Sequence, residues 1–241
     1  MLFSPHRWLR ISILNLLIVS VIGVILRYKI LYSLPFFDQK HLLHGHSHFA
    51  FAGWITQALM ALLVTYLCRQ NATIVFKKYE RLLIINLITA YGMLISFPIE
   101  GYGFFSILFS TLSIFVSYTF AIIYWKDLNR LPEKSISHYW FKAALIFNAI
   151  SSAGAFSLAI MMVTKTIHQN WYLAAIYFFL HFQYNGWFFF SCMGLLNEKI
   201  QPMISENSKL KTIFWFFAIA CIPAYFLSAL WLKIPLIIYI L

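Results

Sequence analysis

Apolar stretches long enough to cross a membrane alternate with short polar connections along the whole chain. About 20 consecutive apolar residues are enough for an α-helix to span the hydrocarbon core of a bilayer. The alternation predicts an all-α, polytopic transmembrane helical bundle of about seven spans, near residues 9–27, 45–68, 82–100, 103–125, 139–163, 171–195 and 212–232. No soluble domain, low-complexity segment or convincing internal repeat stands out, so we expect residues 1–241 to form a single transmembrane domain.

The last predicted span is followed by a short apolar tail. After Lys233 the chain reads Ile-Pro-Leu-Ile-Ile-Tyr-Ile-Leu and ends at Leu241. Such a tail is too short to cross a bilayer. It is therefore either an interfacial segment or the first part of an eighth helix in a longer chain.

Composition supports a membrane protein and excludes several other classes. The chain is 62% hydrophobic, 10% charged and 20% aromatic, whereas soluble domains are roughly 45–50% apolar and about 25% charged. The net charge of +11 is explained by basic residues in cytoplasmic loops, so we expect the lipid bilayer, and no nucleic acid, as a partner. The three cysteines form no Cys-x-x-Cys pair, which excludes c-type haem attachment.

The distribution of basic residues predicts the orientation. The N-terminal end and the second, fourth and sixth connections together carry 13 of the 18 Lys and Arg residues, and the other connections and the tail carry 5. Because basic loops remain on the cytoplasmic side, we expect a cytoplasmic N-terminus in a multi-pass protein of the bacterial inner membrane. The start of the second span then lies on the outer side.

Four of the eight histidines gather at that start, as His41, His44, His46 and His48. Imidazole is the commonest protein ligand for transition metals and also binds haem iron. An ionisable side chain at membrane depth indicates a functional site by default. The cluster therefore predicts a metal or haem site.

Two local structures remain open for this cluster. If the helix begins before His41, then His41, His44 and His48 fall within about 60° of one another on one face. His46 then points the other way, on a stripe with Gln57. If instead Ser47 is an N-cap, only His48 is firmly helical and the preceding residues form a flexible ligand loop.

The sixth span carries a second polar group, centred on His181. Tyr177, His181 and Asn185 are spaced by four residues and share a helix face. His181 is either a cofactor ligand or a structural histidine bonded to a polar neighbour such as Asn148. As a ligand it would need an acceptor that orients its second ring nitrogen, and Tyr177 and Asn185 are each one turn away.

Other polar residues are weaker candidates. Glu100, at the outer end of the third span, is either a proton-relay or metal-adjacent group or a helix-end turn residue. Gln57 is a candidate for a group that supports the histidine cluster. We expect His138 and His168 to be solvated loop residues.

The run His-Gly-His-Ser-His-Phe-Ala-Phe-Ala-Gly-Trp, which ends at Trp54, resembles the His-x-His…Gly-Trp helices of haem-copper oxidase and nitric-oxide reductase catalytic subunits. The segment 180–187, Leu-His-Phe-Gln-Tyr-Asn-Gly-Trp, is also similar to that group. The resemblance implies that His46, His48 and His181 are haem or metal ligands. This chain offers fewer histidines than that family uses and has no adjacent His-His pair, so the resemblance implies one b-type haem, or one copper or non-haem iron ion.

The function expected from these features is redox: a haem protein that passes electrons or handles O2 or NO, with an electron-donor subunit or a second copy of itself as partner. One alternative is a non-catalytic metal or haem carrier, sensor or assembly factor. Further alternatives are a membrane di-iron hydroxylase and a proton-coupled transporter. Iron, copper and zinc all accept imidazole, so the ligand type leaves the metal open.

Overall fold

The computed structural model describes residues 4–71, 74, 76–166, 168–203, 207–232 and 235, and within these ranges the regular structure is entirely helical. The chain divides into two compact units, unit 1 (Met1–Leu131) and unit 2 (Pro132–Leu241). The predicted all-α fold is therefore confirmed. Each unit is described by itself.

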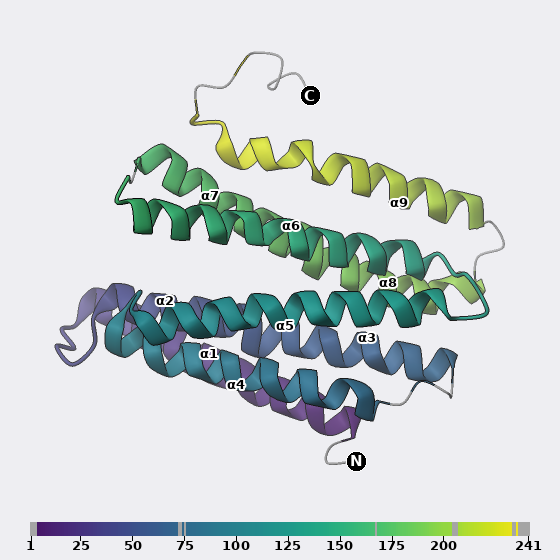
Figure 1. Ribbon diagram of the computed structural model, residues 1–241, viewed down its shortest axis with the longest axis horizontal. Coiled ribbons are helices and arrows are strands. Elements are labelled where there is room, and N and C mark those ends of the chain that lie inside the picture. Colours follow the sequence, from purple (N-terminus) through teal and green to yellow (C-terminus); the bar gives the residue numbers. More distant parts are fainter. Residues whose placement is uncertain are drawn as a thin grey trace. The chain divides into compact units, whose positions relative to one another are not determined.

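Unit 1 is built around one long helix (Figure 1), whose middle segment is a π-helix. This helix consists of α2 (Gln39–Phe49), η1 (Ala50–Thr56) and α3 (Gln57–Gln70). It is flanked by α1 (Pro5–Leu31) and α4 (Lys77–Glu100), and α4 packs against α5 (Phe104–Asn129).

Unit 2 also contains a long helix (Figure 1), and its middle segment is again a π-helix. Its parts are α7 (Gln169–His181), η2 (Phe182–Phe188) and α8 (Phe189–Ile200), which continue into η3 (Gln201–Met203). All three main parts pack against α6 (Ser137–Thr164), and α9 (Asn207–Cys221) with η4 (Pro223–Ala229) completes the unit.

Five helices of the described chain are long and apolar enough to cross a membrane, and a bent pair can supply a sixth crossing. The five are Pro5–Leu31, Gln39–Gln70, Lys77–Glu100, Phe104–Asn129 and Ser137–Thr164, and the pair, bent by 40°, is Ser208–Cys221 with Pro223–Ala229. The sixth predicted span, 171–195, is not among them because polar residues such as Gln183 and Asn185 lower its hydropathy. The count of about seven spans therefore remains a prediction.

The π-helical segment of unit 1 is held by amides from both flanking helices. A π turn disrupts the regular i→i−4 ladder, and a buried carbonyl that loses its ladder partner needs another donor. Asn15 of α1 donates to the Gly53 carbonyl at 2.6 Å, and Asn86 of α4 donates to the Ala52 carbonyl at 3.0 Å. Both asparagines are fully buried, so the widened turn is part of the packed interior.

An ion pair joins the start of α4 to the end of α5. The Asp127 side chain, 3% exposed, accepts hydrogen bonds from Lys78 Nζ at 2.7 and 2.8 Å and from the Tyr79 hydroxyl at 2.6 Å. Arg130 Nη1 lies 3.5 Å from the same carboxylate. The buried carboxylate thus depends on cations that reach it from the surface.

We expect Lys78→Met to destabilise the protein by about 2 kcal/mol. Removing one partner of a buried pair costs about 3–5 kcal/mol, but Lys78 is 45% exposed and solvent weakens its attraction. Thermal unfolding in detergent, followed by circular dichroism, would measure the loss. Lys77→Met is the matched control, because Lys77 is exposed and forms no ion pair within the described chain; equal losses in the two variants would contradict the prediction.

Candidate functional site

The histidine cluster lies on a helix that begins before its first member. Asp38 is the N-cap of α2, and its carboxylate accepts a hydrogen bond from the His41 backbone N–H at 2.9 Å. Ser47 lies inside the helix, and its hydroxyl donates to the Leu43 carbonyl at 2.9 Å. The alternative with Ser47 as an N-cap is therefore wrong, and all four histidines are helical.

Asp38 makes the start of α2 sensitive to acid. The hydrogen bond from the His41 backbone holds the pKa of Asp38 below its usual value of 3.8. Because the folded pKa lies below the unfolded one, the bond contributes stability above the unfolded pKa and loses it as the pH falls through the folded pKa. We expect the His41 amide resonance to titrate below pH 3.8 and to stay constant in Asp38→Asn, which keeps a capping acceptor. An unchanged titration in that variant would contradict this assignment.

Three of the four imidazoles line one face of α2, as the helical alternative predicted. The ring of His48 stacks on Phe97 of α4, with centroids 4.4 Å apart and planes 18° apart. The ring of His44 meets Tyr102 edge-on at 4.6 Å. The ring of His41 occupies the space where Gly101, with a φ of +61°, would carry a Cβ, so only glycine fits this turn.

The fourth imidazole, His46, lies on the other side of the helix. Its Cε1 is 3.3 Å from the place where Gly23 of α1 would carry a Cβ. Its Nδ1 is buried without a hydrogen-bond partner in the described chain. Because His46 and His48 point to opposite sides, they do not converge on one ligand.

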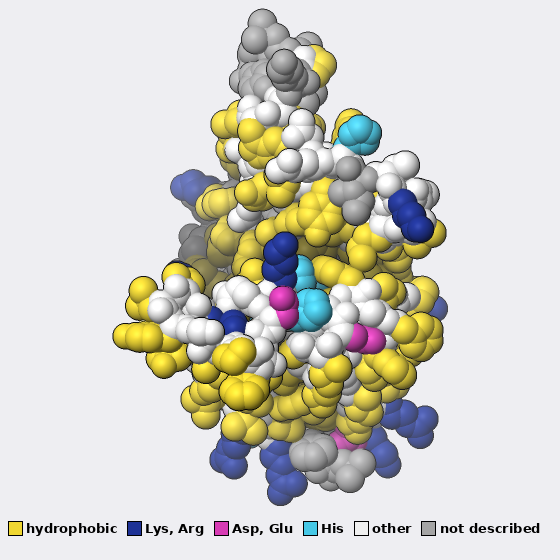
Figure 2. All heavy atoms as spheres, turned by 90° about the vertical axis from the view of Figure 1, so that its left-hand side faces the viewer, with side chains coloured by type: hydrophobic (Ala, Val, Ile, Leu, Met, Phe, Trp, Pro, Cys, Tyr) yellow, Lys and Arg dark blue, Asp and Glu magenta, His cyan; other side chains and the backbone are white. Residues whose placement is uncertain are grey.

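The end of the molecule where α1 finishes and α2 begins is open to the surface. Figure 2 faces this end and shows histidine side chains beside acidic ones. His41, His44, His46 and His48 are each partly exposed. A ligand could therefore approach the cluster from this end without opening the bundle.

The two candidates for supporting groups in unit 1 take part in other contacts. Gln57 accepts from Asn86 Nδ2 at 2.7 Å and donates to the Leu83 carbonyl at 3.2 Å. Glu100 accepts from the Ser106 backbone N–H at 2.7 Å, in the first turn of α5. Gln57 thus belongs to the polar network of η1, and Glu100 makes the helix-end contact of its second alternative.

In unit 2, both ring nitrogens of His181 have partners. Nε2 lies 2.8 Å from the Cys221 carbonyl, and Nδ1 lies 3.1 Å from Nδ2 of Asn185. Since a carbonyl only accepts, Nε2 carries the proton and Nδ1 accepts from the amide. Tyr177 instead contacts Trp231, at a ring distance of 6.1 Å.

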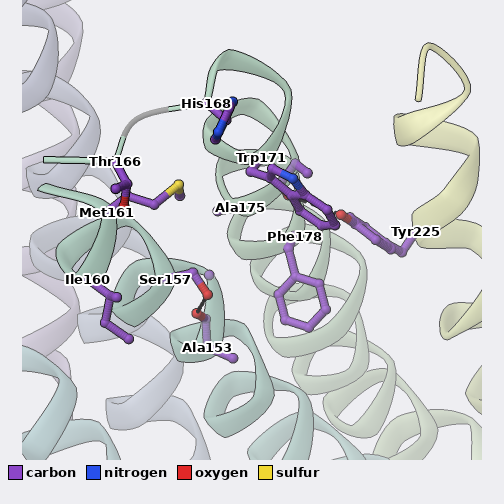
Figure 3. A pocket seen from close by; sticks show the side chains of 12 residues that line it. Ala153, Ser157, Ile160, Met161, Thr166, His168, Trp171, Ala175, Phe178 and Tyr225 are labelled. Carbon is purple, nitrogen blue, oxygen red and sulfur yellow. Dashed lines mark hydrogen bonds between the residues drawn. The ribbon is translucent and has the colours of Figure 1, made fainter. Parts of the chain in front are cut away.

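One cavity of unit 2 is lined mainly by apolar side chains. It has a volume of about 540 Å³ and lies among α6, α7 and η4. Figure 3 shows apolar and aromatic side chains around it, including Trp171, Phe178 and Tyr225, with His168 and Thr166 near one edge. The cavity is suited to apolar contacts, and His181 is not among its lining residues.

The expectation that His138 is solvated was wrong. It lies in the first turn of α6 and is 7% exposed, because the helix begins at Ser137 and turns the ring inward.

The sequence did not reveal the roles of Phe97, Tyr102 and Asn15. Aromatic residues are common in this chain, so nothing in the sequence distinguished the two that contact histidines; the polar Asn15 inside an apolar span was a usable signal.

The side chains of unit 1 can offer one imidazole to a metal or to haem iron, but not a complete set of metal ligands. Within the described ranges, no three His, Cys, Asp or Glu side chains converge as a metal site. The ring of His48 makes no hydrogen bond within the described chain, and stacking on Phe97 fixes the plane of the ring. Such a histidine suits haem iron or a single metal ion, which needs a free nitrogen lone pair.

Over the residues that the structure describes, these features define an all-helical protein with five to six helices able to cross a membrane and a group of histidines near the start of one of them. No family model, curated protein or solved structure matches the chain.

Proposed function

We propose that this chain is a haem-binding membrane protein of the oxidase or nitric-oxide reductase type, which transfers electrons or handles O2 or NO. The observation that carries the proposal is the His48 imidazole. It is free of hydrogen bonds in the described chain, stacked on Phe97 and placed near the start of a 32-residue apolar helix. A haem or metal ligand needs such a free nitrogen lone pair.

The proposed topology has about seven spans with the N-terminus in the cytoplasm of a bacterial cell. The excess of Lys and Arg on one set of connections, 13 against 5, supports this orientation. The histidine cluster then faces outward. A small gas would approach it from the periplasmic side, and an electron-donor subunit or a second copy of the chain is the expected partner.

The residues around His48 have separable tasks. Phe97 restricts rotation of the imidazole, so its lone pair keeps one direction. His44 and Tyr102 cover an adjacent side of the same face. Haem, when bound, would supply one-electron chemistry and gas binding; the chain supplies the ligand and its orientation.

The test is to express the chain in haem-replete cells and record the reduced-minus-oxidised spectrum of the purified protein, with metal analysis of the same sample. A b-type spectrum is the expected result. A featureless spectrum would overturn the proposal, and bound copper, iron or zinc without haem would favour a metal carrier. A haem spectrum without O2 or NO turnover would favour a haem carrier or sensor.

A further inference from the structure

Although no internal repeat was expected from the sequence alone, the long helices of the two units carry the same sequence pattern from their histidines onward. Residues 48–63 and 181–196 align without a gap, at an offset of 133 residues, and seven of the sixteen positions are identical. The identical pairs are His48 and His181, Phe49 and Phe182, Gly53 and Gly186, Trp54 and Trp187, Met60 and Met193, Leu62 and Leu195, and Leu63 and Leu196. Five of the seven involve residue types other than leucine, so the match is more than shared apolarity.

When residue numbers of unit 1 are increased by 133, its helices match those of unit 2 in order and nearly in their first and last residues. Shifting α1 by 133 residues gives 138–164, and α6 is Ser137–Thr164. Shifting η1 gives 183–189, and η2 is Phe182–Phe188. Shifting α4 gives 210–233, where α9 and η4 lie. Each unit thus has a first helix, a long helix with a π segment in the same place, and a third helix.

A buried asparagine of the first helix recurs at the same offset, and in each unit it contacts the π segment, although through a different residue of that segment. Asn15 of α1 donates to the carbonyl of Gly53 in η1 at 2.6 Å. Its counterpart Asn148 of α6 accepts from the side chain of Gln183 in η2 at 2.9 Å. In each unit an asparagine of the first helix therefore binds the π segment that follows the histidine. A polar contact in an apolar bundle needs a specific partner, which makes the recurrence more informative than another apolar match.

We propose that the two units are copies of one helical repeat, in which His48 and His181 occupy the same position and Asn15 and Asn148 are their positioning residues. The asparagine holds the widened turn, and the turn sets the direction of the imidazole that precedes it. His46 corresponds to Phe179 and is not part of the shared pattern. That His48 is a ligand rests on the proposed function; the repeat and the role of the asparagines do not.

The two copies differ in what surrounds the histidine. The two partners of His181, Asn185 and Cys221, correspond to Ala52 and Ile88 in unit 1. Ala52 has no side-chain donor to offer His48. Unit 1 therefore presents a free imidazole, whereas unit 2 fixes the equivalent ring by two hydrogen bonds.

The repeat can be tested by giving His48 the partner that His181 has. Full-length protein labelled with ¹⁵N-histidine would be studied by NMR in detergent without haem, as wild type, Ala52→Asn, Ala52→Leu and Asn185→Ala. We expect Ala52→Asn to move the Nδ1 resonance of His48 toward that of His181. Ala52→Leu, of similar size but without an amide, should not do so, and Asn185→Ala should move His181 in the opposite direction.

The asparagines are tested in the same spectra. Asn15→Leu should broaden or shift the ring signals of His48 and leave those of His181, and Asn148→Leu should do the reverse. Asn15→Asp keeps the acceptor for the Tyr91 hydroxyl, which lies 2.8 Å away, and loses the donor to Gly53; it tests the same contact if the leucine variant does not fold.

Two results would overturn the inference. One is a folded Ala52→Asn protein with unchanged His48 signals. The other is a loss of both histidine signals alike in each asparagine variant. Because these spectra need no haem, a wild-type protein without a haem spectrum would reject the proposed function and leave the repeat standing.

Discussion

His48→Ala is expected to remove the haem spectrum of the purified protein completely, while His46→Ala leaves it in place. His48 has a ring without hydrogen bonds in the described chain and a fixed plane against Phe97. His46 lies on the opposite side of α2, against Gly23. A ligand bound to one imidazole is therefore out of reach of the other, and only the removal of His48 takes away the proposed iron ligand.

The control for this prediction is a measurement showing that both variants still fold. Both variants should keep the wild-type circular dichroism spectrum, since each histidine is only partly buried. Free imidazole added to His48→Ala should restore part of the spectrum, because it can fill the space of the lost ring. Loss of haem in His46→Ala with His48→Ala unaffected would assign the ligand to the α1 side instead.

Gly154→Val is expected to destabilise the protein by about 3 kcal/mol, since overpacking a close contact costs about 1–3 kcal/mol. A Cβ at Gly154 would lie 2.5 Å from the Ala175 carbonyl oxygen and 2.9 Å from the Phe179 backbone nitrogen. Backbone atoms in the middle of α7 cannot rotate away as a side chain can. Small residues allow membrane helices to approach closely in this way, so any side chain here separates α6 from α7.

The neighbouring Ala153→Val provides the comparison, since Ala153 is exposed and borders the cavity. Thermal unfolding in detergent should show a large loss for Gly154→Val and little change for Ala153→Val. A wild-type melting temperature for Gly154→Val would contradict the close contact between α6 and α7. A loss in both would indicate that the cavity border itself is tightly packed.

The part of the site that could be predicted is the part governed by helix periodicity. The spacing of His41, His44 and His48 placed them on one face once the helix began before His41, and Asp38 decides where it begins. The link between His181 and Asn185 was also readable, because residues four apart meet on a helix. The hydrogen bond between His181 and the Cys221 carbonyl could not be predicted, because that carbonyl belongs to another helix.

The sequence alone determined that this protein is all-helical, that its apolar segments suit a membrane and that four histidines gather at the start of one segment. These properties follow from composition and local periodicity, which need no knowledge of neighbours. Only the tertiary structure decided that His46 and His48 face different helices and that each long helix widens into a π segment beside a buried asparagine. Those features depend on contacts between residues far apart in the chain, where packing and hydrogen bonding override the local pattern.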